Sequence, residues 1–129
     1  MIKIQVQADC GNAPKKMFVK DFIVAIVNND QASLEKNATD DIQWTTAGGE
    51  TIEGKEAVLA ALRRFRSDKV AELTIHTIIT HGYDGMAEGL LKFKDGRKEA
   101  FCDVYRFKAS TNHAPVKNIR TYTVEPGNK

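Results

Sequence analysis

Two acidic residues, Glu88 and Asp103, stand on either side of an Asp95-Gly96 pair, each in a segment rich in apolar side chains. Asp-Gly is typical of a two-residue turn that closes a β-hairpin, because both positions tolerate positive φ. If Lys94 pairs with Arg97, Glu88 lies directly opposite Asp103 and both side chains share one face of the sheet. Carboxylates this close repel each other, so the sequence predicts a carboxylate pair in which both groups stay ionised only if another group compensates their charge.

The same register surrounds the pair with apolar and weakly polar side chains, from Met86, Leu90, Phe101, Tyr105 and, across the preceding turn, His76. In such surroundings one carboxyl keeps a proton, or a cation such as protonated His76 or a ligand group lies between the two, or water enters the cavity. A few polar groups inside an apolar pocket are typical of a small-molecule site. The candidate catalytic residues are therefore Asp103, Glu88, His76 and Tyr105.

A register shifted by one residue leads to a different interpretation. Cys102, Val104 and Arg106 would then face inwards, and both acids would be solvated on the outer face. Tyr105 and His76 also fit structural roles, as core or rim residues whose polar atoms are hydrogen-bonded. The residues alone leave both interpretations open.

The first half of the chain predicts helices. Apolar residues recur at helical spacing after Pro14 and predict a helix over 14–28, and Asp30 can cap a short helix that ends near Asn37. An extended segment over 41–45 holds Trp44, which is expected in a pocket wall or in the core. A third helix follows Gly54, with an apolar stripe of Val58, Ala61, Leu62 and Phe65.

The second half predicts strands. Residues 73–80, 86–93, 101–107 and 116–124 are rich in β-branched and aromatic side chains and predict an antiparallel meander. Residues 2–7 alternate apolar and polar side chains, so residues 1–11 are expected to form a strand-like arm. Helices followed by antiparallel strands indicate an α+β fold with the helices on one face of a curved sheet.

Composition narrows the function classes. The 129 residues are 42% hydrophobic and 28% charged with a net charge of +2, which favours one globular domain over residues 1–129 and neither a nucleic-acid nor a membrane partner. Arg63, Arg64, Arg66 and Lys69 are expected to form a solvated helix end, with phosphate contact as the alternative. Two cysteines without C-x-x-C spacing predict neither a disulfide framework nor a four-ligand zinc site, and no spacing of His, Asp and Glu resembles a metal site. We therefore expect no metal, and we expect no cofactor. The lack of a signal peptide or a long apolar run predicts a cytoplasmic location.

Several motifs together resemble the nuclear transport factor 2-like superfamily, which includes SnoaL-like polyketide cyclases and ketosteroid isomerase. The resemblance runs from Asn12 to Val124 and rests on Phe22, Asp41-Ile42-Gln43-Trp44, Gly54, Glu88-Gly89, Asp95-Gly96, residues 101–107 and Ile119-Arg120-Thr121-Tyr122. It implies a cystatin-like roll, in which helices pack in the concave face of a strongly bent, cone-shaped antiparallel sheet. It also implies a deep pocket at the open end and a homodimer joined through the outer sheet face.

The resemblance places Asp103 where ketosteroid isomerase has an aspartate that stays protonated and donates a hydrogen bond to an oxyanion. Phe22 stands where that enzyme has a tyrosine, and the position of its general base falls near Thr46, so steroid isomerisation by that mechanism is not expected. The alignment turns Ile119, Thr121 and Thr123 towards the pocket. The predicted ligand-binding residues are Phe22, Trp44, Thr46, Leu62, Met86, Leu90, Phe101, Ile119 and Thr121.

Two functions remain open from the sequence. The first is a pocket that binds an unidentified small molecule and performs acid–base chemistry of the isomerase, cyclase or hydrolase type with Asp103 and Glu88. The second is a non-catalytic ligand-sensing or protein-interaction domain, in which the acids orient a ligand or hold water.

Overall fold

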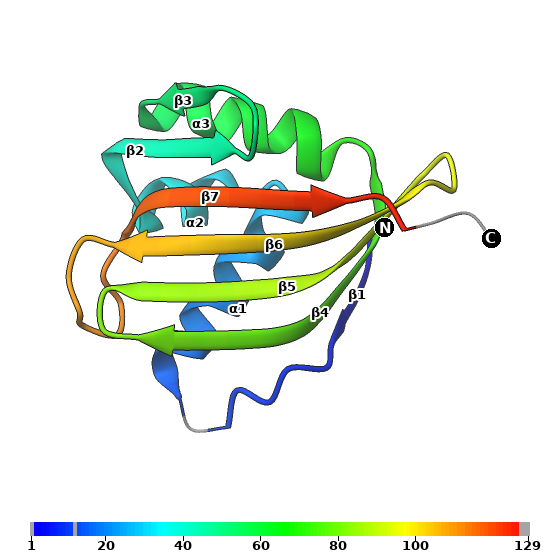
Figure 1. Ribbon diagram of the computed structural model, residues 1–129. Helices are drawn as coiled ribbons and strands as arrows, with labels where there is room; N and C mark the ends of the chain where they lie inside the picture. The colour runs from blue at the N-terminus through cyan, green and yellow to red at the C-terminus, as the bar shows by residue number, and fades with distance from the viewer. Residues whose placement is uncertain (1, 12, 127–129) are drawn as a thin grey trace.

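A bent sheet of seven strands and three helices make up the part of the chain that the structure, a computed structural model, describes: residues 2–11 and 13–126 (Figure 1). Asn12, where the family resemblance begins, lies outside the described residues. The helices are α1 (Pro14–Val27), α2 (Gln31–Asn37) and α3 (Lys55–Leu62), which continues as a π-helical turn over Arg63–Ser67. The strands are β1 (Lys3–Val6), β2 (Ala38–Thr46), β3 (Thr51–Glu53), β4 (Val70–His81), β5 (Asp84–Phe93), β6 (Lys98–Phe107) and β7 (Val116–Val124).

The strands are ordered β1-β4-β5-β6-β7-β2-β3. The pairs β4–β5, β5–β6, β6–β7 and β2–β3 are antiparallel, as expected of a meander and a hairpin. The prediction of a wholly antiparallel sheet is wrong, because β1 pairs with β4 and β2 with β7 in parallel. Both parallel partners come from the N-terminal half, which reaches the two sides of the meander through long connections.

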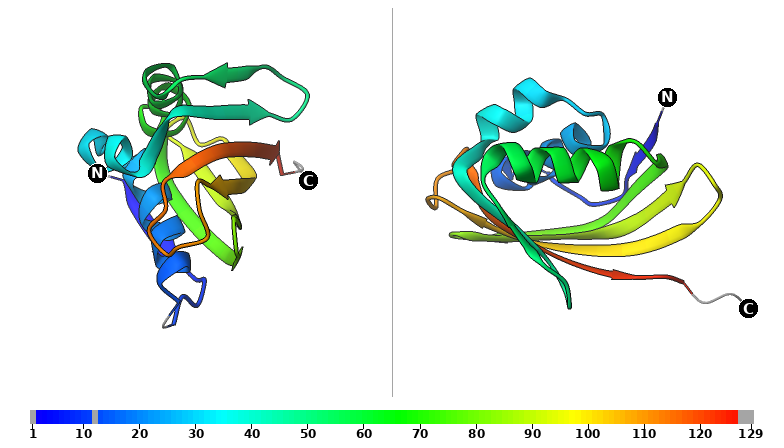
Figure 2. Two further views of the ribbon diagram at one scale, coloured as in Figure 1. Left: turned by 90° about the vertical axis from the view of Figure 1, so that its left-hand side faces the viewer. Right: turned by 90° about the horizontal axis from the view of Figure 1, so that it is seen from above.

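The helices lie on one side of the bent sheet, where they cover its inner face (Figure 2, right). Asp30 accepts a hydrogen bond from the backbone N–H of Ser33 at 3.2 Å and so begins α2 as expected. The core joins the apolar faces of α1 and α3 to inward side chains of every long strand, among them Ile23, Leu62, Leu73, Tyr105 and Ile119. The α+β class and the bent sheet are confirmed.

A glycine at the centre of β5 allows the sheet to bend. A bulge in β4 between Ile75 and Thr77 interrupts the pairing opposite Gly89. A Cβ on Gly89 would lie 1.9 Å from the carbonyl oxygen of Thr74, so any other residue would push the two strands apart. Such a close approach of backbones next to a bulge is typical of a sharply curved sheet.

The hairpin between β5 and β6 has a loop of three residues, where the sequence predicts two. Phe93 donates its N–H to the carbonyl of Arg97 at 2.8 Å, and Lys94, Asp95 and Gly96 form the loop. Gly96 has a φ of +92°, the left-handed position that ends a three-residue loop. The Asp-Gly turn is therefore present, but the loop is one residue longer, and the pairing of Lys94 with Arg97 is wrong.

Because of the extra loop residue, β5 presents the opposite set of side chains to the core from the set that the sequence predicts. Glu88 lies opposite Cys102, and Asp103 lies opposite Ala87. Strand β6 keeps the predicted direction, with Phe101, Asp103 and Tyr105 buried, whereas β5 presents the opposite face. The predicted carboxylate pair is thus wrong: the two acids lie on opposite faces of the sheet.

Within the described residues, none of the helices combines the length and the apolar composition that a membrane crossing requires.

Candidate functional site

Asp103 lies at the centre of a buried hydrogen-bond cluster. Its Oδ1 accepts from Arg66 Nη2 at 2.9 Å and from Thr121 Oγ1 at 2.8 Å, and its Oδ2 accepts from Arg66 Nη1 and from the hydroxyl of Tyr105, both at 2.9 Å. Trp44 Nε1 in turn donates to Thr121 Oγ1 at 2.8 Å. The side chains of Arg66 and Asp103 are 5% and 1% exposed, so this ion pair is shielded from solvent.

All four contacts are donors to the carboxylate, and together they fill its acceptor positions. Burial raises the pKa of Asp103. The charge and hydrogen bonds of Arg66, together with the hydroxyls of Thr121 and Tyr105, lower the pKa by more than burial raises it, so the pKa lies below its ordinary value. Burial and the neighbouring carboxylate raise the pKa of Tyr105 well above its ordinary value. Asp103 is therefore ionised and Tyr105 is a neutral donor.

Arg66 reaches Asp103 because α3 ends in a π-helical turn. The N–H of Asp68 donates to the carbonyl of Arg63 at 3.0 Å, an i to i+5 bond. A π turn holds more residues than an α turn, so the inward position after Leu62 moves from residue 65 to residue 66. The prediction that Phe65 belongs to the apolar stripe is wrong, since Phe65 is 50% exposed and Arg66 is buried.

The sequence interpretation missed Arg66 by treating it as part of a solvated helix end. Two signals point to it. Arg66 follows Leu62 by four residues, so it lies on the same helix face as a core residue. A carboxylate expected inside the core also requires a cation beside it, and the three helix-end arginines were available partners.

A cavity of about 490 Å³ opens beside this cluster, at the end of the molecule where β2, β7, the β5–β6 hairpin and the π-helical turn meet. Its walls come from twelve residues with apolar, aromatic and charged side chains. Trp44, Phe65, Phe93 and Ile52 supply the apolar surface, and the Trp44 and Phe65 rings meet edge-on with centroids 6.2 Å apart. Arg66 and Thr121 are the polar lining residues that are buried, so they form the cavity floor.

The other polar lining residues surround the mouth. Lys69, Arg97, Glu50, Thr46 and Thr123 are exposed, and Glu99 is half-buried. Arg97 also lies over the Phe93 ring at 4.3 Å from its centroid. The mouth therefore mixes positive and negative charge, whereas the floor presents the guanidinium of Arg66.

The predicted ligand-binding residues separate into three groups. Trp44, Thr46 and Thr121 line the cavity. Phe22, Leu62, Phe101 and Ile119 are buried in the core, where Phe101 lies beneath the Arg66 guanidinium at 5.0 Å. Met86 and Leu90 lie on the outer face because β5 is turned over, so their predicted place in the pocket is wrong.

The four predicted catalytic residues form two pairs on opposite faces of the sheet. Asp103 and Tyr105 are hydrogen-bonded on the inner face. On the outer face Glu88 Oε2 accepts from Thr77 Oγ1 at 2.7 Å, and Glu88 Oε1 lies 3.5 Å from His76 Nδ1. The side chains of His76 and Glu88 are 42% and 38% exposed, so this second pair is solvated and lies outside the cavity.

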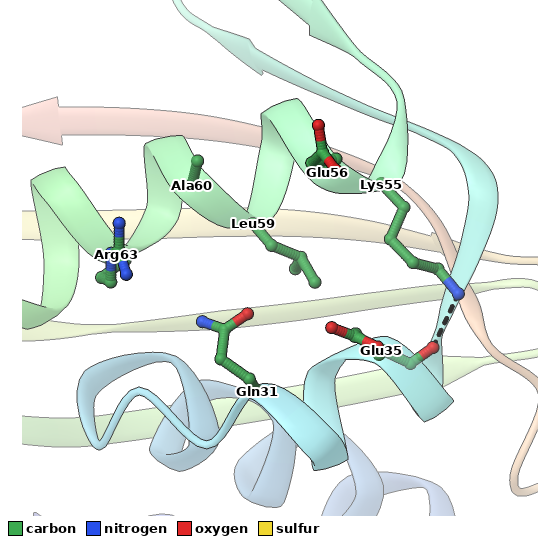
Figure 3. A pocket seen from close by; sticks show the side chains of 7 residues that line it. All are labelled: Gln31, Glu35, Lys55, Glu56, Leu59, Ala60 and Arg63. Carbon is green, nitrogen blue, oxygen red and sulfur yellow. Dashed lines mark hydrogen bonds between the residues drawn. The ribbon is translucent and has the colours of Figure 1, made fainter.

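A second hollow, of about 410 Å³, lies between α2 and α3 and is lined by Gln31, Glu35, Lys55, Glu56, Leu59, Ala60 and Arg63 (Figure 3). Lys55 is held there by the carbonyl of Glu35 at 2.7 Å and by Asp40 at 3.2 Å. Most of its lining side chains are exposed or already paired, so it is a groove between two packed helices. The cavity above the Arg66–Asp103 pair is the better candidate site.

The sequence itself matches the family model described as a SnoaL-like domain over residues 19–111, and the chain belongs to that family. A search of the curated proteins gave no match.

Solved structures show how widely the fold is shared. An NTF-2 like protein of unknown function from Burkholderia xenovorans LB400 is 16% identical, with a TM-score of 0.75 over 94% of this chain and 91% of the other. An LEH-like epoxide hydrolase from M. tuberculosis is 22% identical, with a TM-score of 0.69 over 86% and 79%. A de novo designed protein with a curved β-sheet is 17% identical, with a TM-score of 0.74 over 88% of each chain. At these identities the likeness concerns the fold alone.

Replacing Asp103 by Asn tests the ion pair. The variant keeps the shape of the side chain but leaves the Arg66 charge uncompensated inside the core, so we expect a loss of about 3–5 kcal/mol in the free energy of unfolding. Urea denaturation of wild type and variant measures that loss.

Glu88→Gln is the matched control, because it neutralises the exposed carboxylate of the outer face. We expect it to change the unfolding free energy by less than about 1 kcal/mol. Similar small effects for both variants would contradict the account of the buried pair.

Proposed function

We propose that this protein binds a small organic molecule in the cavity beside Arg66. The observation that carries the proposal is a buried guanidinium on the floor of a cavity whose apolar wall is formed by Trp44, Phe65, Phe93 and Ile52. Apolar walls with a few oriented polar groups are the usual composition of a small-molecule site. In this proposal Asp103 is a positioning residue, which holds Arg66 in place and makes no contact with the ligand.

Binding is better supported than acid–base catalysis by Asp103 and Glu88. Asp103 is ionised and has its acceptor positions filled, so it has neither a proton to donate nor a free lone pair to abstract one. Glu88 lies on the other face of the sheet, beyond the reach of a molecule in the cavity. The non-catalytic alternative is therefore the function that we propose.

A fragment screen tests the proposed site with a built-in probe. Trp44 is the single tryptophan of the chain and lines the cavity, so its indole ¹⁵N–¹H signal reports occupancy without further assignment. We expect aromatic fragments to shift this signal. The Thr123→Phe substitution, which places a ring at the cavity mouth, is expected to weaken their binding about ten-fold or more.

Thr111→Phe serves as the control, since it adds the same ring to an exposed loop at the opposite end of the sheet. It should leave the fragment affinities unchanged. Fragments that leave the indole signal in place, or that bind the Thr123→Phe variant as tightly as wild type, would contradict the proposed function.

We also propose that two copies associate through the outer face of the sheet. This face carries exposed apolar side chains on the two outer strands of the meander, with Ile79 on β4 54% exposed and Tyr122 and Val124 on β7 46% and 67% exposed. Arg120 and Tyr122 point outwards, because their strand neighbours Thr121 and Ile119 point into the molecule. Apolar patches of this kind are typical of protein–protein contacts.

Sedimentation equilibrium tests this association. We expect wild type to sediment as a dimer, and Tyr122→Glu to shift the equilibrium towards monomer because it replaces an exposed apolar ring of this face, opposite Cys102, by a charge. Ala60→Glu adds the same charge on an exposed position of α3 and should leave the dimer intact. A monomeric wild type, or equal behaviour of the two variants, would refute the association.

A further inference from the structure

The hydrogen-bonding groups on the cavity floor define what kind of ligand the cavity accepts. An arginine side chain has five N–H donors, and Arg66 uses two of them on Asp103. The pairing is end-on through both Nη atoms, so the remaining three N–H groups point away from the carboxylate. Among the described residues none accepts a hydrogen bond from these three.

The other polar groups of the floor are almost fully used by the protein. The Thr121 hydroxyl donates to Asp103 and accepts from Trp44, which leaves one lone pair. The Trp44 N–H is committed to Thr121, and both oxygens of Asp103 accept two hydrogen bonds each. Two of the free Arg66 N–H groups, Nε–H and one Nη–H, share one edge of the guanidinium, and the third lies on the opposite edge. A ligand that reaches the floor therefore meets N–H donors of Arg66 and one acceptor position.

Charge then distinguishes between the possible oxygen acceptors. The Arg66 charge is already balanced by Asp103 at 2.9 Å in a site shielded from water. A ligand carboxylate on the floor would place a second negative charge beside the Arg66 guanidinium. The other lining cations, Lys69 and Arg97, are exposed at the mouth together with Glu50, so they would not compensate the hydration that a buried carboxylate loses. A ketone, ester or amide oxygen accepts the free N–H groups without adding charge.

We propose that the cavity selects neutral carbonyl compounds with a flat apolar body, and that Arg66 donates to the carbonyl oxygen. The body lies against the Trp44 and Phe65 rings, and the oxygen points to the floor. This inference rests on the proposed binding function and adds the ligand class. Arg66 is then the residue that determines specificity, and Asp103 holds its guanidinium in place through two hydrogen bonds.

Four naphthalene compounds that differ at one substituent test the ligand class: 2-acetylnaphthalene, 2-ethylnaphthalene, 2-naphthoate and 2-naphthylmethylamine. Titrations of wild type are followed by the Trp44 indole signal. We expect the ketone to bind about ten-fold tighter than the hydrocarbon, in line with one hydrogen bond from a charged donor, and the carboxylate and the ammonium compound to bind more weakly than the ketone.

The Arg66→Lys variant is the matched test of the donor. It keeps a cation beside Asp103 but has no planar fork that serves carboxylate and ligand at once. Its preference for the ketone, taken as the ratio of ketone affinity to hydrocarbon affinity within the same protein, should fall to about two-fold or less. If this variant does not fold, the ¹⁵N–¹H signal of Arg66 Nε in wild type replaces it, and that signal should shift with the ketone and not with the hydrocarbon.

The outcomes separate the inference from the function on which it rests. Equal affinity of ketone and hydrocarbon, tighter binding of the carboxylate, or an unchanged preference in Arg66→Lys would overturn the ligand class while leaving the binding function in place. Failure of all four compounds to shift the Trp44 signal would count against the proposed function itself.

Discussion

A carboxylate in a protein core requires a matching cation, and the pairing of Asp103 with Arg66 meets that requirement here. The carboxylate comes from the middle of the sheet and the guanidinium from the end of α3, so the ion pair joins the two layers of the fold. Tyr105, Thr121 and, through Thr121, Trp44 are oriented by the same carboxylate. The cavity floor is therefore a consequence of how one buried charge is satisfied.

The bend of the sheet creates the open end of the molecule beside which this ion pair lies. Gly89 and the bulge in β4 let the strands curve around the helices, and the curvature leaves an open end beside Trp44 and Phe65. A designed protein with a curved sheet and an epoxide hydrolase have similar folds, so this architecture does not by itself specify chemistry. Any chemistry must therefore come from the side chains on the cavity floor.

The sequence predicts the elements well because hydrophobic spacing is a local property. The helix over Pro14–Val27 and the strand over Val116–Val124 agree with expectation within a residue. Strand register is harder, since an Asp-Gly pair suits both a two-residue loop and a three-residue loop with Gly96 in the left-handed position. That single residue separated Glu88 from Asp103. The spacing from Leu62 places Arg66 on the core face, whereas the outward position of Phe65 goes with a π turn that the hydrophobic spacing of α3 does not predict.

The protonation state of Asp103 tests this account most directly. The ¹³C signal of its carboxyl carbon, assigned by its loss in Asp103→Asn, can be followed from pH 8 to acid conditions. The account predicts a constant signal down to about pH 5 and a midpoint below about 3.9, the ordinary aspartate value, because the donors around the carboxylate stabilise its charged form. A midpoint above about pH 5 would mean a carboxyl that keeps its proton, and would contradict the ion pair on which the cavity floor depends.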